Sequence, residues 1–247
     1  MKPAARWTLK MLTPLLAAAA GSCATTTLSP ASTAMTQPGA ANVAVSSLDG
    51  VRVTAQADAW KGDPGVGRAV QPVRITINNE GSEALRIRYS DFALIAPDGH
   101  RYSALPPFAV EGDITSPLLP RGFAPIRSPG FGYRRFFLAP YYAPLYPGLA
   151  TWNWPYSFYD PWYYPFYHQV LMDAVRPTAE MLGLALPEGV VEPHGMLSGF
   201  LYFQKVGTDT PRVTFRWDLI SVEQESGRAL GEISIPFDVK HDARADR

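Results

Sequence analysis

The stretch PVRITINNEGSEALRIRYSDFALIAPDGHRY, residues 72–102, decides the fold. Apolar and polar residues alternate from Val73 to Asn78 and again from Leu85 to Tyr89. A period of two is what a half-buried β-strand requires, because successive side chains point to opposite faces of the sheet. Between these two strands we predict a tight reversal with a positive φ at Gly81. Asp98-Gly99, which lies between apolar runs, predicts a hairpin.

The same alternation returns near the carboxyl end of the chain. In residues 212–221, RVTFRWDLIS, every second residue is apolar, and one face therefore carries Val213, Phe215, Trp217 and Leu219. Residues 233–239 alternate as well, and Pro236 predicts an edge position for that strand because proline lacks an amide hydrogen.

These runs, with residues 48–57 and 196–204, predict roughly seven or eight short strands and almost no helix. The predicted fold class is therefore all-β, an immunoglobulin-like antiparallel β-sandwich over residues 49–240 with a tail at 241–247. A long insert at about 105–185 interrupts it. Strands before Leu105 and after Pro187 each leave an apolar face, so we expect them to pack together as one domain.

The amino terminus has the features of an export signal. A basic start, with Lys2, Arg6 and Lys10, precedes an apolar run at 11–20. This run is too short to cross a bilayer, which takes roughly 20 apolar residues, and it predicts a signal peptide at 1–22. The small residues Ala19-Ala20-Gly21-Ser22 stand directly before Cys23, the only cysteine. The alternative is an ordinary secretory signal that is cut after Ala20.

The arrangement around Cys23 resembles the lipobox of bacterial lipoproteins, in which the cysteine becomes the acylated first residue of the mature chain. The resemblance implies a lipid (palmitate) anchor at Cys23. Because Ala24 rather than Asp follows the cysteine, it also implies the outer membrane of the cell envelope. Residues 24–47 carry no charge and few large apolar side chains. We therefore expect residues 23–48 to be the acylated cysteine and a flexible tether reaching about 25–30 Å.

The charge of the mature chain argues against nucleic acid as a partner. Removing residues 1–22 takes away three of the 22 basic side chains and none of the 22 acidic ones, so the net charge becomes −3. The mature chain has no run rich in Lys and Arg. Nucleic-acid binding depends on neutralising phosphates with such basic residues.

Several short motifs together resemble a known module. Residues 90–94 (SDFAL), 98–102 (DGHRY), 186–189 (LPEG) and 195–203 (GMLSGFLYF) resemble the telokin-like immunoglobulin modules of bacterial lipoproteins. The resemblance covers about 51–104 and 186–239, and it implies an immunoglobulin-like fold. It brings no catalytic residues, and the long insert departs from the pattern.

The insert is rich in proline and aromatic residues, most densely at 141–169. Its prolines recur too often for a helix or a central strand. Residues 178–184, after Pro177, predict a short helix capped by Thr178. The rings either pack over the sandwich, bind an envelope protein or glycan, or contact the membrane. We expect Trp162 to be buried and the pair Trp152 and Trp154 to be exposed. The candidate binding residues are Trp152, Trp154, Tyr156, Tyr159, Trp162, Tyr163 and Tyr164.

No motif predicts a metal, a cofactor or a catalytic centre. The four histidines, His100, His168, His194 and His241, have no metal-ligand spacing. Ser198 lies within a predicted strand, whereas a nucleophile elbow needs a strand-to-helix turn. Gly65-x-Gly67, in the predicted loop 60–67, indicates a turn rather than a phosphate cradle.

The sequence therefore favours a non-enzymatic outer-membrane lipoprotein that acts as an envelope binding or interaction module through its aromatic insert. One alternative is an enzyme with its site in the insert, for example for glycan hydrolysis. Convergence of Asp160, Asp173 and His168 in one pocket would favour that alternative. A second alternative is an immunoglobulin-like protease inhibitor.

Overall fold

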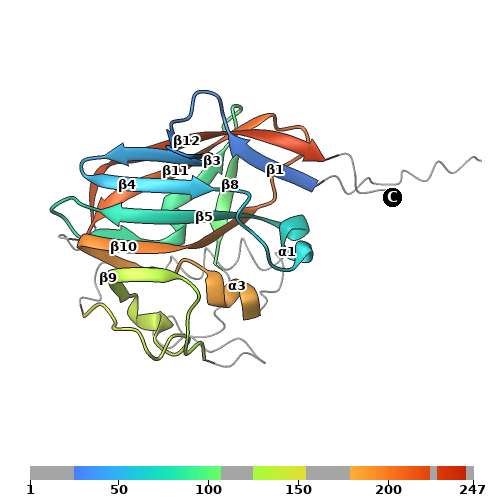
Figure 1. The fold of residues 1–247 in the computed structure, drawn as a ribbon. Helices are drawn as coiled ribbons and strands as arrows, with labels where there is room; N and C mark the ends of the chain where they lie inside the picture. The colour runs from blue at the N-terminus through green and yellow to red at the C-terminus, as the bar shows by residue number, and fades with distance from the viewer. Residues whose placement is uncertain (1–24, 107–124, 154–178, 223–226, 243–247) are drawn as a thin grey trace, which may run out of the picture.

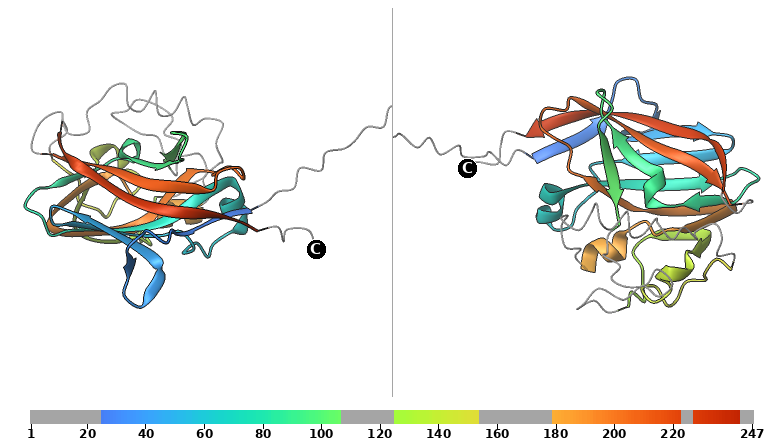
Figure 2. Two further views of the ribbon diagram at one scale, coloured as in Figure 1. Left: turned by 90° about the horizontal axis from the view of Figure 1, so that it is seen from above. Right: turned by 180° about the vertical axis from the view of Figure 1, so that it is seen from behind.

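A computed structural model describes residues 25–106, 125–153, 179–222 and 227–242. Within these ranges the protein is mostly antiparallel β-sheet, folded into a sandwich-like, all-β body of two layers (Figures 1 and 2). One layer has the order β1 (Thr25–Pro30), β12 (Arg228–Asp242), β11 (Arg212–Ser221), β7 (Phe92–Ile95) and β8 (Arg101–Leu105). The other has the order β10 (Gly189–Gln204), β5 (Val70–Asn79), β4 (Val51–Gln56), β3 (Ala40–Leu48) and β2 (Thr36–Gln37).

Strands from before and after the insert pair with each other in both layers. In one layer Leu197 of β10 lies opposite Ile77 of β5, and in the other Phe215 of β11 lies opposite Leu94 of β7. Short pairings join the layers at their corners: β8 pairs with β10, and β6 (Leu85–Ile87) pairs with both β10 and β11. The two halves of the sequence therefore form one body, as the apolar faces predict.

The core lies between the layers, and Trp217 is at its centre. Its side chain is fully buried and stacks on Phe92, with ring centroids 5.3 Å apart. The other members of the predicted apolar face of β11, Val213, Phe215 and Leu219, are also buried. The face assignment made from the period of two is confirmed.

Residues 25–48 are not a flexible tether, and that prediction is wrong. β1 pairs with β12 along its whole length, from Thr25 opposite Asp242 to Pro30 opposite Phe237. Leu28 and Ala44 are buried in the core. Composition misled here because small side chains suffice when neighbouring strands supply the hydrogen bonds and most of the apolar surface. The β2–β3 hairpin projects from the body (Figure 2, left).

Pro236 does not mark an edge strand, because β12 lies between β1 and β11. The proline is tolerated because it faces the last residues of β1. Its carbonyl oxygen accepts the amide hydrogen of Ala31, just past the end of that strand. The Ala31 carbonyl oxygen, which would face an amide hydrogen at position 236, instead accepts the amide hydrogen of Ala34 at 2.9 Å.

The reversal after β5 also differs from the prediction. β5 and β6 do not pair with each other, and Gly81 is not among the described residues with positive φ. A close approach favours glycine there, because a Cβ atom would lie 3.0 Å from the carbonyl oxygen of Asp49 and the backbone would have to shift. The predicted hairpin at Asp98-Gly99 is confirmed: β7 pairs with β8, and Gly99 has a φ of 88°.

Residues 60–67, predicted as a loop, contain part of a short helix, α1 (Pro64–Ala69). Pro64 occupies its first turn, where a missing amide hydrogen is harmless, and the Asp63 side chain accepts the Gly65 amide hydrogen at 2.7 Å. The glycines lie inside this helix and form no phosphate cradle.

The insert contributes regular structure to the body. β9 (Gly132–Leu138) pairs with the outer edge of β10, and η2 (Pro140–Tyr142) follows it. The predicted short helix is present as α3 (Ala179–Leu184), whereas its proposed cap Thr178 lies outside the described residues. Among the described helices, none is long and apolar enough to cross a membrane.

Candidate functional site

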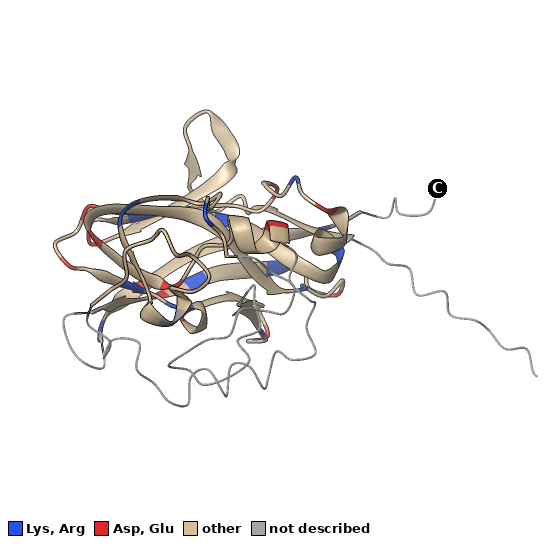
Figure 3. Ribbon diagram, turned by 90° about the horizontal axis from the view of Figure 1, so that it is seen from below, with Lys and Arg blue, Asp and Glu red and all other residues tan. Residues whose placement is uncertain are grey.

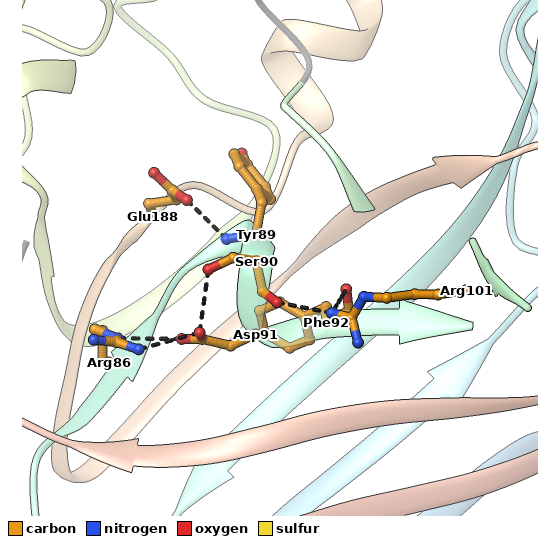
Figure 4. Close-up of polar contacts among 7 residues, drawn as sticks. All are labelled: Arg86, Tyr89, Ser90, Asp91, Phe92, Arg101 and Glu188. Carbon is orange, nitrogen blue, oxygen red and sulfur yellow. Dashed lines mark hydrogen bonds and ion pairs between the residues drawn. The ribbon is translucent and has the colours of Figure 1, made fainter. Parts of the chain in front are cut away.

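A buried cluster of charged residues lies where the sandwich meets the insert (Figure 4). The Arg86 guanidinium donates two hydrogen bonds to the Asp91 carboxylate, at 3.1 and 3.2 Å, and the Ser90 hydroxyl donates a third at 3.2 Å. Burial raises the pKa of the Asp91 carboxyl, and the positive charge of Arg86 opposes that rise. The ion pair therefore offsets the burial of the Asp91 charge only in part.

Glu188 is the second carboxylate of this cluster and is fully buried. It accepts the Tyr89 amide hydrogen at 2.7 Å and the Tyr142 hydroxyl at 2.9 Å. The Tyr89 hydroxyl in turn donates to the Leu186 carbonyl at 2.8 Å. Since Tyr142 belongs to the insert, these bonds tie the insert to the sandwich.

Motifs that are far apart in the sequence meet in this cluster. Residues 90–92 and 186–189 supply its carboxylates, and Arg101 donates to the Ser90 carbonyl at 2.8 Å (Figure 4). Asp91 and Glu188 do not line the aromatic hollow described below, nor the hollow beside Asp49 and Leu230, nor the one beside Gln37 and Glu80. Within the described residues they hydrogen-bond to their neighbours in the fold. We therefore assign the cluster a structural role, the joining of β6, β7, β10 and the insert.

An open hollow of about 280 Å³ lies at the start of the aromatic segment. We call it the aromatic hollow, and it is lined by Phe137, Thr151, Trp152, Asn153 and Glu192. The Trp152 amide donates to the Leu138 carbonyl at 2.8 Å, which holds this segment against the end of β9. The Trp152 ring meets Phe137 edge to face, with centroids 5.8 Å apart.

Trp152 is half-buried, so the prediction that it is exposed is wrong. Its ring packs partly against the core, as well as lining the aromatic hollow. Its indole Nε1 is buried, and no described residue accepts its hydrogen. A ring that is fixed on one side and open on the other can offer apolar contact area with little further loss of rotamer freedom.

A β-bulge positions the carboxylate at the rim of the aromatic hollow. The register of β9 and β10 shifts between Val191 and Met196, so that residues 192–195 of β10 face a single residue of β9. Two non-glycine residues there have positive φ, Arg135 at 48° and His194 at 63°. The Arg135 guanidinium donates to the Glu192 carboxylate at 3.1 Å. Bulges and strained φ values are enriched beside functional sites, where they redirect side chains.

The structure also places the other candidate residues within its described ranges. His100 and His194 are exposed, and Ser198 lies within β10 with its hydroxyl 2.8 Å from that of Thr76. Those contacts suit a sheet residue rather than a nucleophile. No group of His, Cys, Asp and Glu side chains in the described part of the chain could hold a metal ion. Charges of both signs are interspersed over the surface (Figure 3).

Several predicted residues lie outside the described residues. They are Cys23, Trp154, Tyr156, Tyr159, Trp162, Tyr163 and Tyr164, together with Asp160, His168 and Asp173. Their predictions therefore stay predictions. The strand that carries His241 is described, as the end of β12.

Of the five residues that line the aromatic hollow, sequence reasoning named only Trp152. It missed Thr151 and Asn153, which flank that residue, and it missed Phe137 and Glu192, which lie in β9 and β10. Phe137 lies inside a segment that the prolines suggested was irregular throughout. A signal for Glu192 was present, because Pro193 interrupts the long apolar run of β10 and an interior proline indicates a bulge or an edge.

Comparison of the chain with models of protein families, with curated proteins and with solved structures found no match. The resemblance to telokin-like modules therefore rests on the quoted motifs alone.

Proposed function

We propose that the chain is a non-enzymatic, lipid-anchored protein of the bacterial outer membrane that binds an envelope glycan or protein at the aromatic hollow. The observation that carries the proposal is Trp152, which is hydrogen-bonded to the end of β9 and packed on Phe137 while it also lines an open hollow. Binding sites are typically concave and largely apolar, with a few polar groups that fix the orientation of the ligand.

The lining of the aromatic hollow suits a ligand with an apolar face and a polar edge. Trp152 and Phe137 offer ring surfaces, and Thr151, Asn153 and Glu192 offer a hydroxyl, an amide and a carboxylate. A sugar ring has such faces and edges, as does an aromatic or Arg side chain of a protein. Tryptophan is enriched among the residues that dominate binding energy, which favours Trp152 as the main contact.

Binding without hydrolysis is favoured over the alternative of a glycan hydrolase. Glycosidases generally need two carboxyl groups at a defined separation across the scissile bond. Among the described residues that line the aromatic hollow, Glu192 is the only carboxylate, and it is paired with Arg135. The Arg135 guanidinium donates a hydrogen bond to this carboxylate, which holds it in place as a hydrogen-bond acceptor.

The binding proposal is tested by changing Trp152 to Ala, with Tyr133→Ala as the matched control. Tyr133 has an exposed ring and lies in β9, the strand that also carries Phe137, but it does not line the aromatic hollow. The assays are a pull-down from envelope extract and a calorimetric titration with a panel of soluble oligosaccharides. We expect Trp152→Ala to weaken binding at least tenfold, or about 1.4 kcal/mol.

The melting temperature of each variant distinguishes lost binding from lost structure. Because Trp152 is half-buried, we expect the melting temperature to fall by a few degrees for Trp152→Ala. It should stay nearly unchanged for Tyr133→Ala. Equal retention of all ligands by wild type, Trp152→Ala and Tyr133→Ala would refute the aromatic hollow as the binding site.

The anchor is tested separately. Cys23→Ser removes the thiol that would carry the acyl group, and we expect the variant to move from the membrane fraction to the soluble fraction. Metabolic labelling with palmitate provides a direct readout, since only the wild-type chain should become labelled. A variant that stays in the membrane fraction would contradict anchoring through Cys23.

A further inference from the structure

The first strand of the body begins almost at the proposed anchor. β1 starts at Thr25, two residues beyond Cys23. Two residues of chain span at most about 7 Å. An acylated cysteine keeps its backbone at the membrane surface, because its acyl chains lie in the hydrocarbon layer. Lipidation of Cys23 would therefore hold the start of β1 within about 7 Å of the headgroups.

The start of β1 is fixed to the rest of the body. The Thr26 hydroxyl donates to the Val206 carbonyl at 3.2 Å. The Lys205 ammonium donates to the carbonyls of Thr26, at 3.1 Å, and Gly67, at 2.6 Å. These bonds join β1, the loop 205–211 and α1 into one unit. β1 could act as a flexible spacer only if these hydrogen bonds and its pairing with β12 were broken.

The side chains at this end suit a lipid headgroup region. Trp60, which precedes α1, is half-buried and packs edge to face on Phe200 and Tyr202. Tryptophan is enriched at membrane interfaces, where one part of the ring is buried and another is wet. The exposed charged residues of this region include the basic Lys61, Arg68 and Lys240 and the acidic Asp58, Asp63, Glu180 and Asp209. Because positive and negative charges nearly balance, electrostatic attraction to the lipid headgroups is weak. The lipid anchor is therefore the main source of affinity for the membrane.

We propose that this end of the sandwich, formed by α1, the start of β1 and the loop 205–211, rests directly on the phospholipid headgroups. We call it the membrane-facing end. This inference rests on the lipidation in the proposed function. It replaces the expected 25–30 Å spacer with direct contact, and it commits the domain to one orientation on the bilayer.

The orientation separates the membrane from the aromatic hollow. β10 runs from the hollow to the membrane-facing end, with Glu192 near its start and Gln204 at its finish (Figure 1). The nine steps of regular strand from Gly195 to Gln204, at about 3.3 Å each, alone span roughly 30 Å. The aromatic hollow would therefore open on the side of the domain away from the bilayer, within reach of a partner in the adjoining aqueous space.

The test uses the single cysteine to attach the chain chemically. The chain from Cys23 onward, whose fold is checked by circular dichroism, is coupled to vesicles of phosphatidylethanolamine and phosphatidylglycerol that carry a maleimide lipid. Backbone hydrogen exchange is then compared with that of the same chain in solution. A matched variant carries a 20-residue Gly/Ser linker between Ala24 and Thr25, which adds a spacer of about 25 Å.

We expect direct attachment to slow exchange at residues 60–68 and 205–210 while β9 exchanges as in solution. The linker variant should return the membrane-facing end to its solution rate. Unchanged exchange on direct attachment, protection that centres on β9, or equal protection with the linker would each overturn the inference. Because maleimide coupling replaces the biological acyl group, the result does not depend on whether cells acylate Cys23, which palmitate labelling tests.

Discussion

Replacement of Trp217 by Ala tests the assignment of the core most directly. The side chain is fully buried, stacks on Phe92 and lies opposite Ile233 of β12. Removal of a buried tryptophan ring leaves a cavity and typically costs about 3–5 kcal/mol. In a body of this size each kcal/mol lowers the melting temperature by roughly 2–4 °C, so we expect a fall of roughly 10 °C.

A second variant, Trp217→Phe, separates the cavity from the polar atom. The indole Nε1 of Trp217 is buried, and no described residue accepts its hydrogen. A buried donor without a partner costs about 1–3 kcal/mol. Phenylalanine keeps a ring against Phe92 and removes that donor, so the two effects oppose each other. We expect a net loss below about 1.5 kcal/mol.

The assay for both variants is urea unfolding followed by far-ultraviolet circular dichroism, which does not depend on the altered fluorophore. A loss below about 1 kcal/mol for Trp217→Ala would refute the reasoning, because a ring at the centre of the core cannot be removed so cheaply. Equal losses for Ala and Phe would contradict both the cavity account and the assignment of the indole nitrogen as a donor without an acceptor, because removal of such a donor should raise the stability.

Two further predictions concern charge and close packing. Burial raises the pKa of Asp91 above its ordinary value of 3.8, so the folded state holds the proton to higher pH than the unfolded state. Its contribution to the unfolding free energy is therefore greatest below 3.8 and falls as the pH rises through the raised pKa. This fall should be missing from the pH profile of Asp91→Asn, and a steeper fall in the variant would contradict the sign. Gly199→Ala should destabilise the body by about 1–3 kcal/mol, because its Cβ would lie 2.8 Å from the Leu186 backbone. Gly67→Ala, in α1 with nothing within 4 Å of its Cβ, should instead stabilise by up to about 1 kcal/mol, and thermal unfolding of both variants checks the contrast.

The period of two was enough to predict the class of fold and the buried face of β11. It reports which side of a strand is covered, which is decided locally by the residues themselves. Partner choice is not decided locally. The edge position predicted for Pro236 was wrong because β1, from the other end of the chain, pairs with β12. The positive φ predicted at Gly81 was also wrong, and β6 pairs with the distant strands β10 and β11 instead of β5.

The candidate site was predicted only in part. An accumulation of rings indicated the segment that contains Trp152, and the structure places that residue at the aromatic hollow. The exposure of the ring was misjudged because composition does not show that backbone bonds to Leu138 draw this segment onto the sheet. Glu192 was missed because a bulge, rather than a motif, directs it to the hollow.

The pairing of the first strand with the last has a consequence for how the chain folds. β1 pairs with β12, and β10 pairs with β5. The paired residues are far apart in the sequence, as Asn79 and Gly195 are in the second pairing. Closing such long loops is entropically costly and makes folding slow, on the order of milliseconds to seconds or longer. A chain that emerges amino terminus first cannot complete the layer of β1 until its final strand has appeared. During synthesis the early strands thus expose unpaired edges, and this interval is when the protein is most prone to aggregate.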